Sequence, residues 1–347
     1  MNVAESDEMH EIATALALEI RAAVHPHLGR AAARTATGVA PGGDVTMAID
    51  EIAEAVLERR LAALGNIAYY SEDRGYVVFG TPRATLVVDP IDGTRPAAAG
   101  LEACVVSIAV LPPDPDARLG DVAAGVVVEL RSGAVIEARR GAGARLDGIA
   151  LRCTGAPALH QVFWGASQRA RPALPVAIVL GDLIDAGAMH GGYFDLGSAA
   201  FTMTRIATGQ LDAYVDPGAR MVADVPDLEA AFRAVGGGIV ATNWPYDIAA
   251  AALIVAEAGG TVTDASGRSL DDRPAVGSGD DYRVSVLAAV NDEVHAMLLD
   301  ALDAGMARLA ALPAPPMAWS TAVGTLTPTD FEGLCPYLAT NVPLEGS

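Results

Sequence analysis

The spacing of apolar residues changes along the chain between a helical and a strand-like period, which predicts a mixed α/β protein. Residues 5–24 and 49–64 repeat apolar side chains every three to four positions, as at Ile12, Leu16 and Ile20, and are predicted to be amphipathic helices. Shorter runs with high β-propensity lie after them, at residues 69–72, 85–88, 104–111, 125–130 and 135–139.

The second half of the chain alternates strand-like with helix-like segments. Residues 176–180 are predicted to form a strand, and residues 199–208 and 247–258 to form helices. This alternation favours a layered α/β (α+β) architecture over a β-sandwich or a helix bundle. From residue 310 the chain is rich in Ala and Pro, which predicts an extended tail. The predicted units are therefore an N-terminal α+β subdomain (1–150), a C-terminal α/β subdomain (151–309) and the tail (310–347).

Two aspartates follow the apolar run at residues 85–88, three positions apart and separated by a proline. Asp89 and Asp92 can converge on one hard cation, because Mg²⁺ prefers carboxylate oxygens and retains sites for water and phosphate. The amides of Gly93 and Thr94 would then open a helix or turn, where amide groups bind phosphate oxygens. Asp, Pro and Gly are also common turn residues, so the segment taken alone is equally consistent with a surface turn.

Further acidic residues flank other predicted elements. Glu72 and Asp73 end a β-prone run, and Asp247 precedes an apolar helix. Taken singly, the first two are typical of a solvated loop, and Asp247 is typical of a helix cap. Asp44 and Asp50 are consistent, in the same way, with a loop and with the cap of the second helix.

The charge composition limits the partners of the chain. It has 23 basic and 43 acidic residues, a formal net charge of −20. A field of this sign repels nucleic acid and anionic membranes, which bind through basic patches. It also repels a phosphorylated substrate unless bound cations reverse the local charge. Every basic residue is Arg, so a P-loop lysine and Schiff-base chemistry are excluded.

Segments that would direct the chain out of the cytoplasm are not evident. Residues 1–11 are acidic, with no basic region followed by an apolar run, and do not resemble a signal peptide. The longest apolar stretch, 248–256, is too short to span a bilayer. Cys104, Cys153 and Cys335 are odd in number and widely spaced, which favours reduced thiols. We therefore expect a cytoplasmic protein.

Taken together, the acidic segments resemble the hallmarks of the inositol monophosphatase superfamily and occur in the same order. These hallmarks are an acidic pair after a strand, an Asp-Pro-Ile-Asp-Gly-Thr segment, and a Trp/Tyr-Asp-x-Ala-Ala helix ending in Glu-Ala-Gly-Gly. In this chain they lie at residues 72–73, 89–94 and 246–260. The Gly-Ser-Ala-Ala segment at 197–200 adds a weaker match. The resemblance spans residues 44–267 and is specific, because three linked motifs coincide.

The resemblance implies the layered αβαβα sandwich of the inositol monophosphatase/fructose-1,6-bisphosphatase type, usually assembled as a homodimer. It implies a magnesium-dependent phosphomonoesterase that binds two or three Mg²⁺ ions. The implied metal ligands are four carboxylates and one backbone carbonyl: Glu72, Asp89, the Ile91 carbonyl, Asp92 and Asp247.

The same resemblance implies the catalytic groups. Thr94 would orient the attacking water, and Glu72 would act at the reacting centre. The partner of Thr94 is expected to be Asp50, with Asp44 as the alternative, because the loop before Asp50 is one residue longer than usual. Gly93 and Thr94 would also bind the phosphate. Direct attack by water needs no protein nucleophile, so the absence of a catalytic Cys or Lys is no objection.

The expected substrate contacts are less well defined. Ser198, Ala199 and Asp216 fall where relatives hold substrate hydroxyls. Relatives often have an Arg three residues before the Gly-Ser-Ala-Ala segment, where this chain has Phe194. The stretch 218–245 is longer than usual, and is either a lid or specificity loop or a neutral surface insertion.

The implied substrate is a small phosphorylated metabolite, with inositol 1-phosphate as the default. A sugar bisphosphate, histidinol phosphate or a nucleotide or nucleoside phosphate of a specialised pathway are the alternatives. The missing Arg and the absence of Lys disfavour a second phosphate site and hence bisphosphates. A non-catalytic, metal-binding relative is the competing class of function, although every expected ligand is present.

Overall fold

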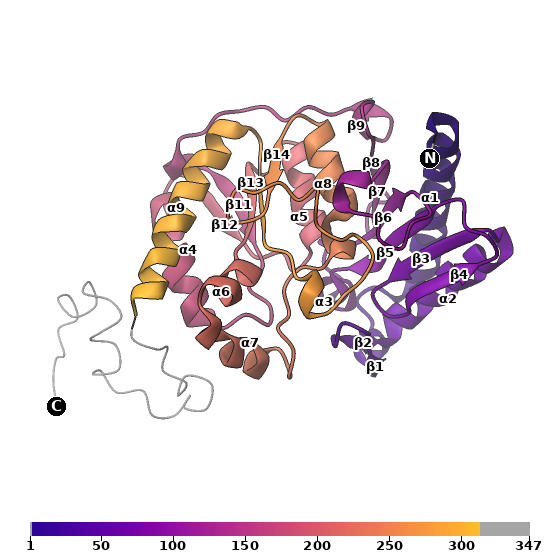
Figure 1. Ribbon diagram of the computed structural model, residues 1–347, viewed down its shortest axis with the longest axis horizontal. Coiled ribbons are helices and arrows are strands. Elements are labelled where there is room, and N and C mark those ends of the chain that lie inside the picture. Colours follow the sequence, from indigo (N-terminus) through magenta and orange to yellow (C-terminus); the bar gives the residue numbers. More distant parts are fainter. Residues whose placement is uncertain (1, 313–347) are drawn as a thin grey trace.

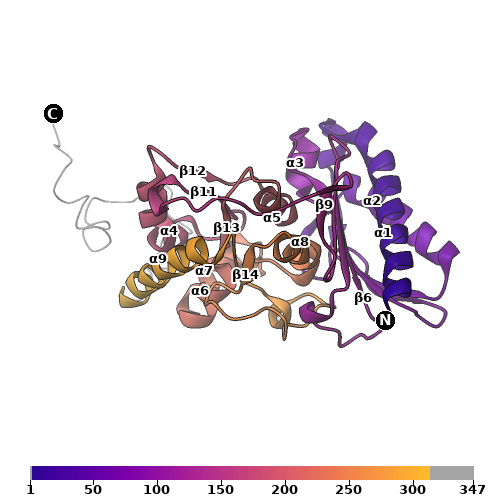
Figure 2. The same cartoon turned by 90° about the horizontal axis from the view of Figure 1, so that it is seen from above.

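Two β-sheets separate three layers of helices, so the chain is stacked in the order α, β, α, β, α. The computed structural model describes residues 2–312 (Figure 1). Figure 2 shows the layers edge-on, from α1 and α2 on one side to α4 and α9 on the other. Each layer buries its apolar face against the next, which is the general reason for such stacks. The layered sandwich predicted from the sequence is confirmed.

The larger sheet has eight strands and belongs to the first half of the chain. In spatial order they are β10 (Ile149–Ala150), β9 (Gly143–Leu146), β8 (Val135–Arg139), β7 (Ala124–Glu129), β6 (Val105–Leu111), β5 (Thr85–Asp92), β3 (Ile67–Ser71) and β4 (Gly75–Phe79). β3 and β5 are parallel, and the other neighbours are antiparallel. All eight residues of β5 are buried, because helices cover both faces of the sheet at its centre.

Two helices cover the outer face of this sheet, α1 (Val3–Val24) and α2 (Ala48–Leu64), close to the predicted ranges. Asn2 caps α1 by accepting a hydrogen bond from the Glu5 amide at 3.0 Å. The apolar stripe of α1, including Leu16 and Ile20, is fully buried in the same cluster as the outward face of β5 and β6.

The smaller sheet has five strands from the second half of the chain. In spatial order they are β12 (Gly192–Phe194), β11 (Phe163–Ala166), β13 (Ala213–Asp216), β15 (Val286–Ala289) and β14 (Thr261–Thr263). The central helices α5 (Ala199–Ala207) and α8 (Pro245–Glu257) lie between the two sheets, and α4 (Ala173–Gly187) and α9 (Asp292–Ala311) cover the far face. The central helices therefore have no face directed to solvent over most of their length.

Shorter elements connect the layers. They are the hairpin β1 (Ala36–Val39) and β2 (Val45–Met47), the helices α3 (Thr94–Ala99), α6 (Gly218–Asp224) and α7 (Glu229–Val235), and 3₁₀ turns at His25–His27, Ala31–Arg34, Leu119–Asp121, Leu159–Gln161, Pro226–Leu228 and Asp280–Tyr282. α6 and α7 are formed by the long stretch 218–245 and lie at one end of the smaller sheet (Figure 1).

One predicted element is wrong. Residues 176–180, expected to be a strand, lie inside α4. Their continuous apolar run hides a helical period, in which Val176, Val179, Leu180 and Leu183 are buried at spacings of three and four. A short apolar run cannot distinguish a buried strand from a buried helix by periodicity alone.

The predicted tail begins too early, because α9 continues to Ala311, past residue 310. The rest of that prediction lies outside the described residues. The larger sheet ends in sequence with β10, at Ala150, and the division into subdomains there stays a prediction. Between residues 2 and 312, none of the helices combines the length and apolarity that crossing a bilayer requires.

The larger sheet approaches a central helix closely at Gly125 of β7. A Cβ atom there would lie 2.7 Å from the Ala250 carbonyl oxygen and 2.9 Å from the Ala250 Cα atom, both in the backbone of α8. We expect Gly125→Ala to lower the free energy of unfolding by about 1–3 kcal/mol, because α8 must be displaced. Urea denaturation measures this change.

The matched control is Gly181→Ala in α4, where an added Cβ meets no atom within 4 Å. This substitution should be neutral or stabilising by up to about 1 kcal/mol, the usual gain from Gly to Ala in a helix. Equal effects at the two positions would contradict the close packing of β7 on α8.

Candidate functional site

The end of β5 brings two aspartates to the same place. On a regular strand, residues three apart point to opposite faces of the sheet. The pairing of β5 with β6 shifts register between Asp89 and Asp92, and an irregularity of this kind re-aims side chains. Both carboxyl groups are buried, and the Ile91 amide donates a hydrogen bond to Asp89 Oδ1 at 3.0 Å.

The N-terminus of α5 holds Asp92. The Ser198 hydroxyl and the Ala200 amide each donate a hydrogen bond to Asp92 Oδ2 at 2.6 Å. Ser198 is also the helix cap, since its hydroxyl accepts from the Phe201 amide at 3.1 Å. A helix N-terminus stabilises a carboxylate at this position. The structure therefore turns the Ser198 hydroxyl toward a predicted metal ligand, and both Ser198 and Ala199 are buried.

The third aspartate comes from the first turn of α8. Asp247 Oδ2 accepts a hydrogen bond from the Trp244 amide at 2.6 Å, so the residue caps its helix as well as facing the site. Asp89, Asp92 and Asp247 each offer an oxygen within 4.8 Å of the others. Two sheet-end aspartates and one helix-start aspartate thus meet, although residues 92 and 247 are far apart in sequence.

Glu72 lies in the turn after β3 and does not belong to this group of three. It is nonetheless near, because its charge is the strongest neighbouring influence on the pKa of Asp89. Asp73 turns away, accepting a hydrogen bond from the Thr46 hydroxyl.

Burial and mutual repulsion raise the pKa values of these carboxyl groups. Burial raises the pKa of Asp92 to about 6, against the hydrogen bonds from Ser198 and Ala200. The pKa values of Asp89, Asp247 and Glu72 lie well above the usual range, first because of burial and then because each group faces the charge of its neighbours. Such a cluster favours protons or cations over free negative charge.

Asp50 and Asp44 have different surroundings. Asp50 is buried at the start of α2, accepts a hydrogen bond from the Met47 amide at 2.7 Å, and interacts with the Thr94 hydroxyl. Burial raises its pKa to about 7. Asp44 instead forms ion pairs with Arg169 and, at 3.8 Å, with Arg95.

The segment between Asp92 and α3 is shaped by one glycine. Gly93 has φ of 90°, and a Cβ atom there would lie 2.5 Å from the Ala103 carbonyl oxygen. Only glycine adopts this conformation at no cost in strain. The Thr94 hydroxyl, on the first residue of α3, donates to the Ile91 carbonyl at 3.2 Å. Thr94 and the Ile91 carbonyl are therefore neighbours in the segment that follows Asp89.

Asp216 is not free to meet a ligand. It is fully buried at the end of β13, where Arg171 pairs with both of its oxygens and the Gly218 amide donates at 2.9 Å. Arg171 also donates to the Arg169 carbonyl at 2.7 Å. The sequence analysis missed Arg169 and Arg171. Their only sequence signal is a pair of arginines, two apart, directly after the segment that forms β11.

The donor chemistry of the site suits a hard divalent cation. All side chains of the three-residue group are carboxylates, and the nearby Ile91 group is a carbonyl. Oxygen-only sets favour Mg²⁺, Ca²⁺ or Mn²⁺ over Zn²⁺, which selects Cys and His. The raised pKa values also favour a bound cation, because a cation relieves the repulsion that raises them.

Comparison with known families gives one match across the described chain. The model of the inositol monophosphatase family matches residues 5–306. This range contains every residue of the site described above.

Curated relatives cover most of the same range. A fructose-1,6-bisphosphatase/inositol-1-monophosphatase of Methanothermobacter thermautotrophicus is 28% identical over 303 residues, covering 84% of this chain and 95% of the relative. The inositol-1-monophosphatase SuhB of Mycobacterium tuberculosis is 31% identical over 233 residues, covering 63% of this chain and 68% of the relative.

Solved structures share the fold. The Thermotoga maritima IMPase superposes with a TM-score of 0.63 at 20% identity, covering 87% of this chain and 99% of that structure. At this identity the likeness supports the fold alone.

The raised carboxyl pKa values generate a prediction about stability. A group whose pKa is raised on folding stabilises the protein at low pH, and this contribution is lost as pH rises through the folded-state pKa. In chelator, we expect the melting temperature to fall between pH 5 and pH 8, as Asp92 and its neighbours become charged. Saturating Mg²⁺ should restore at least about 1 kcal/mol at pH 8, less at pH 5. Calorimetry with and without Mg²⁺ measures the pH dependence of the melting temperature and the stabilisation by Mg²⁺. A stabilisation by Mg²⁺ that does not depend on pH would contradict metal binding by these carboxyl groups.

Proposed function

The chain belongs to the inositol monophosphatase family, and we propose that it hydrolyses a small polyol or sugar phosphate, with inositol 1-phosphate as the default substrate. As a family member it is a phosphoric monoester hydrolase. The observation that carries the proposal is the convergence of Asp89, Asp92 and Asp247, each held by a backbone amide, on one largely buried place.

We propose Mg²⁺ as the cofactor, as two or three ions. The ligands would be Glu72, Asp89, the Ile91 carbonyl, Asp92 and Asp247. When bound, the metal supplies a Lewis acid for the phosphate oxygens and lowers the pKa of an attacking water. The residues of the chain hold the proposed metal ligands in position. The Ser198 hydroxyl and the amides of α5 orient Asp92, and the Trp244 amide orients Asp247.

For proton handling we favour Asp50 over Asp44 as the partner of Thr94. Asp50 is buried, interacts with the Thr94 hydroxyl, and has a pKa of about 7, suited to accepting a proton near neutral pH. Asp44 is already neutralised by Arg95 and Arg169. In this scheme Thr94, with Asp50 as its partner, would orient the attacking water, and Glu72 would take part at the reacting centre.

The contacts to the substrate follow from the same geometry. The Gly93 and Thr94 amides, at the start of α3, would bind the phosphate. Ser198 and Ala199 would act through Asp92 rather than by touching substrate, because the Ser198 hydroxyl is already used. Asp216 would likewise act through Arg171, which it pairs with in the core.

A sugar bisphosphate is a second candidate, favoured by one observation. Arg95 and Arg169 converge on the two oxygens of Asp44, with 44% and 38% of their side chains exposed. Arg169 also lies near the proposed metal ligands, since its positive charge lowers the pKa of Asp247. Two guanidinium groups close to the proposed metal ligands suit a second anionic group. The Methanothermobacter relative is named for both activities.

The proposal also includes a cytoplasmic homodimer. Within residues 2–312, Cys104 and Cys153 form no disulfide, which is consistent with a reducing compartment. The exposed aromatic pair Phe163 and Phe194, with ring centroids 6.3 Å apart, lies on the neighbouring strands β11 and β12 and would be covered by a second subunit.

The experiment that tests the function is phosphate release from a substrate panel. Inositol 1-phosphate, fructose 1,6-bisphosphate, histidinol phosphate and a nucleoside monophosphate are compared at equal concentration, with Mg²⁺ and then with chelator. We expect Mg²⁺-dependent release, fastest from a monophosphorylated polyol. Fastest release from the bisphosphate selects the second candidate. Binding of Mg²⁺ without turnover of any substrate would support a non-catalytic relative.

Removing one ligand charge tests the site itself. We expect Asp92→Asn to lower kcat by more than about 100-fold, because changes even outside the first metal shell cost 10- to 100-fold. The melting temperature in chelator should stay equal or rise, since one repelling charge is removed. Asp182→Asn on the surface of α4, where 68% of the side chain is exposed, is the matched control and should change neither. Normal turnover by Asp92→Asn would exclude the proposed metal site.

A further inference from the structure

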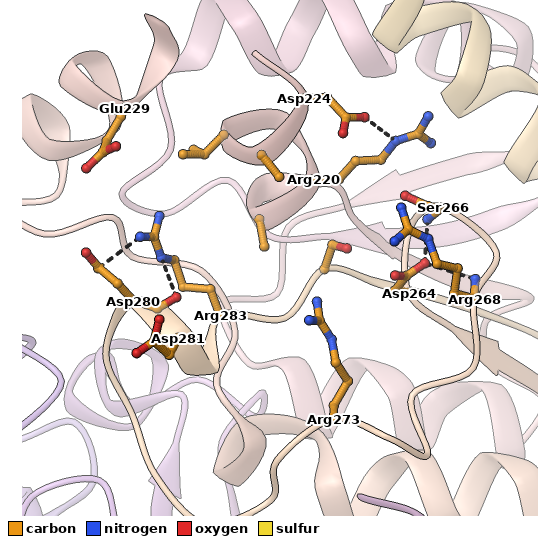
Figure 3. Close-up of a pocket in the computed structure, with 14 residues that line it drawn as sticks. Arg220, Asp224, Glu229, Asp264, Ser266, Arg268, Arg273, Asp280, Asp281 and Arg283 are labelled. Atoms are coloured by element: carbon orange, nitrogen blue, oxygen red, sulfur yellow. Dashed lines mark hydrogen bonds and ion pairs between the residues drawn. The ribbon is translucent and has the colours of Figure 1, made fainter. Parts of the chain in front are cut away.

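A polar cavity of about 400 Å³ lies beside α6, outside the aspartate cluster (Figure 3). Its walls come from three places: α6 and the first residue of α7, the turn after β14, and the segment that leads into β15. None of the predicted metal, catalytic or substrate residues lines it.

The long stretch 218–245 builds one wall of this cavity. Residues 219–224 and Glu229 belong to that stretch, and the opposite wall belongs to residues 264–285. The stretch was ambiguous in sequence, either a specificity segment or a neutral insertion. A neutral insertion needs no polar cavity on its inner side, whereas a binding segment does.

Two guanidinium groups of the cavity are largely buried, and the carboxylates that pair with them are more exposed; Asp264 is a buried carboxylate in the same lining, and Arg268 is exposed. The side chains of Arg220 and Arg283 are only 13% and 16% exposed. Their acidic partners Asp224 and Asp280 are 46% and 56% exposed, so they stand at the rim. The low-dielectric interior strengthens the field of the inner charges relative to the solvated rim.

Two further arginines in the cavity have no acidic partner among residues 2–312. Arg268 and Arg273 line it, yet neither guanidinium forms an ion pair or hydrogen bond within that range. Figure 3 shows Arg273 pointing into the cavity between Arg283 and Asp264, with no dashed line to another side chain. Asp264 forms no ion pair with either arginine, and its Oδ1 accepts the Ser266 and Arg268 amides of its own turn.

Exposed arginines within residues 2–312, such as Arg59, also form no ion pair, but Arg273 is half-buried and points into the cavity. The buried arginines are paired, Arg171 with Asp216 and Arg205 with Glu129. A planar guanidinium group with free donors is the side chain best suited to carboxylate and phosphate oxygens.

We propose that this cavity is a second binding site, which takes a small anion carrying phosphate or carboxylate groups through Arg273 and Arg268, with Arg220 and Arg283 behind them. The site is independent of the proposed hydrolysis, because it shares no residue with the aspartate cluster. Its ligand would enter past the acidic rim, which selects compact anions over nucleic acid or extended acidic chains.

The test is isothermal titration of the full-length protein in Mg²⁺ with two probes, sulfate as a phosphate-like anion and succinate as a dicarboxylate. We expect one of them to bind at one site per chain, with Kd at or below about 1 mM. Arg273→Met should weaken binding at least about tenfold, the loss expected for a charge-assisted hydrogen bond. The probe that binds identifies which anion chemistry the cavity prefers.

Two further variants distinguish binding in this cavity from binding at the metal centre or on the protein surface. Arg60→Met, an equivalent change at a surface arginine paired with Glu19 at 2.9 Å, should bind the probe normally. Asp247→Asn, which disables the aspartate cluster, should also bind it normally. Loss of binding in Asp247→Asn would place the anion at the metal centre, and equal binding by wild type and Arg273→Met would likewise overturn the proposal. Unchanged melting temperature of Arg273→Met excludes unfolding as the cause of any loss, because that side chain makes no hydrogen bond within residues 2–312.

Discussion

The repulsion between buried carboxylates is the constraint on which the rest of this structure depends. Asp89 and Asp92 are buried and Asp247 is partly buried, so water screens their repulsion weakly and each must be held in place by other forces. The fold supplies these forces through backbone amides at the starts of α5 and α8 and at the end of β5. Both central helices therefore direct their positive ends at the same acidic place. The backbone amides offset part of the repulsion between the carboxylates, and a bound cation offsets the rest.

The chemistry of the site could be predicted because its carboxylates lie in short, recognisable sequence motifs. Asp89 and Asp92 lie in one short segment, and the role of a carboxylate follows from its type and its neighbours in sequence. The partners of these groups could not be predicted, because they come from distant segments. Asp216 was expected to face a substrate, yet its carboxylate is taken by Arg171, 45 residues away. No local pattern distinguishes an aspartate with such a partner from one without.

The layered fold could be predicted from the alternation of periods, whereas individual elements depended on context. α1, α2 and α8 were predicted within a few residues, because each has an amphipathic or apolar pattern with clear ends. α4 was mistaken for a strand because part of its solvent face carries small apolar residues such as Ala173 and Ala177, which weakens the polar face that marks a helix in sequence.

The placement of α5 and α8 between two sheets has a consequence for how such a chain can change over time. A helix enclosed on both sides acts as a spacer of fixed thickness, so the distance between the sheets is set by small residues such as Gly125 and Ala250. Segments at the open ends of the sheets do not lie between the two sheets and therefore do not set this distance. The stretch that forms α6 and α7 can therefore lengthen, shorten or acquire new charges while the reacting centre keeps its dimensions. The architecture separates the rigid reacting centre from the stretch that forms α6 and α7. New binding properties can therefore arise in that stretch without changing the geometry of the reacting centre.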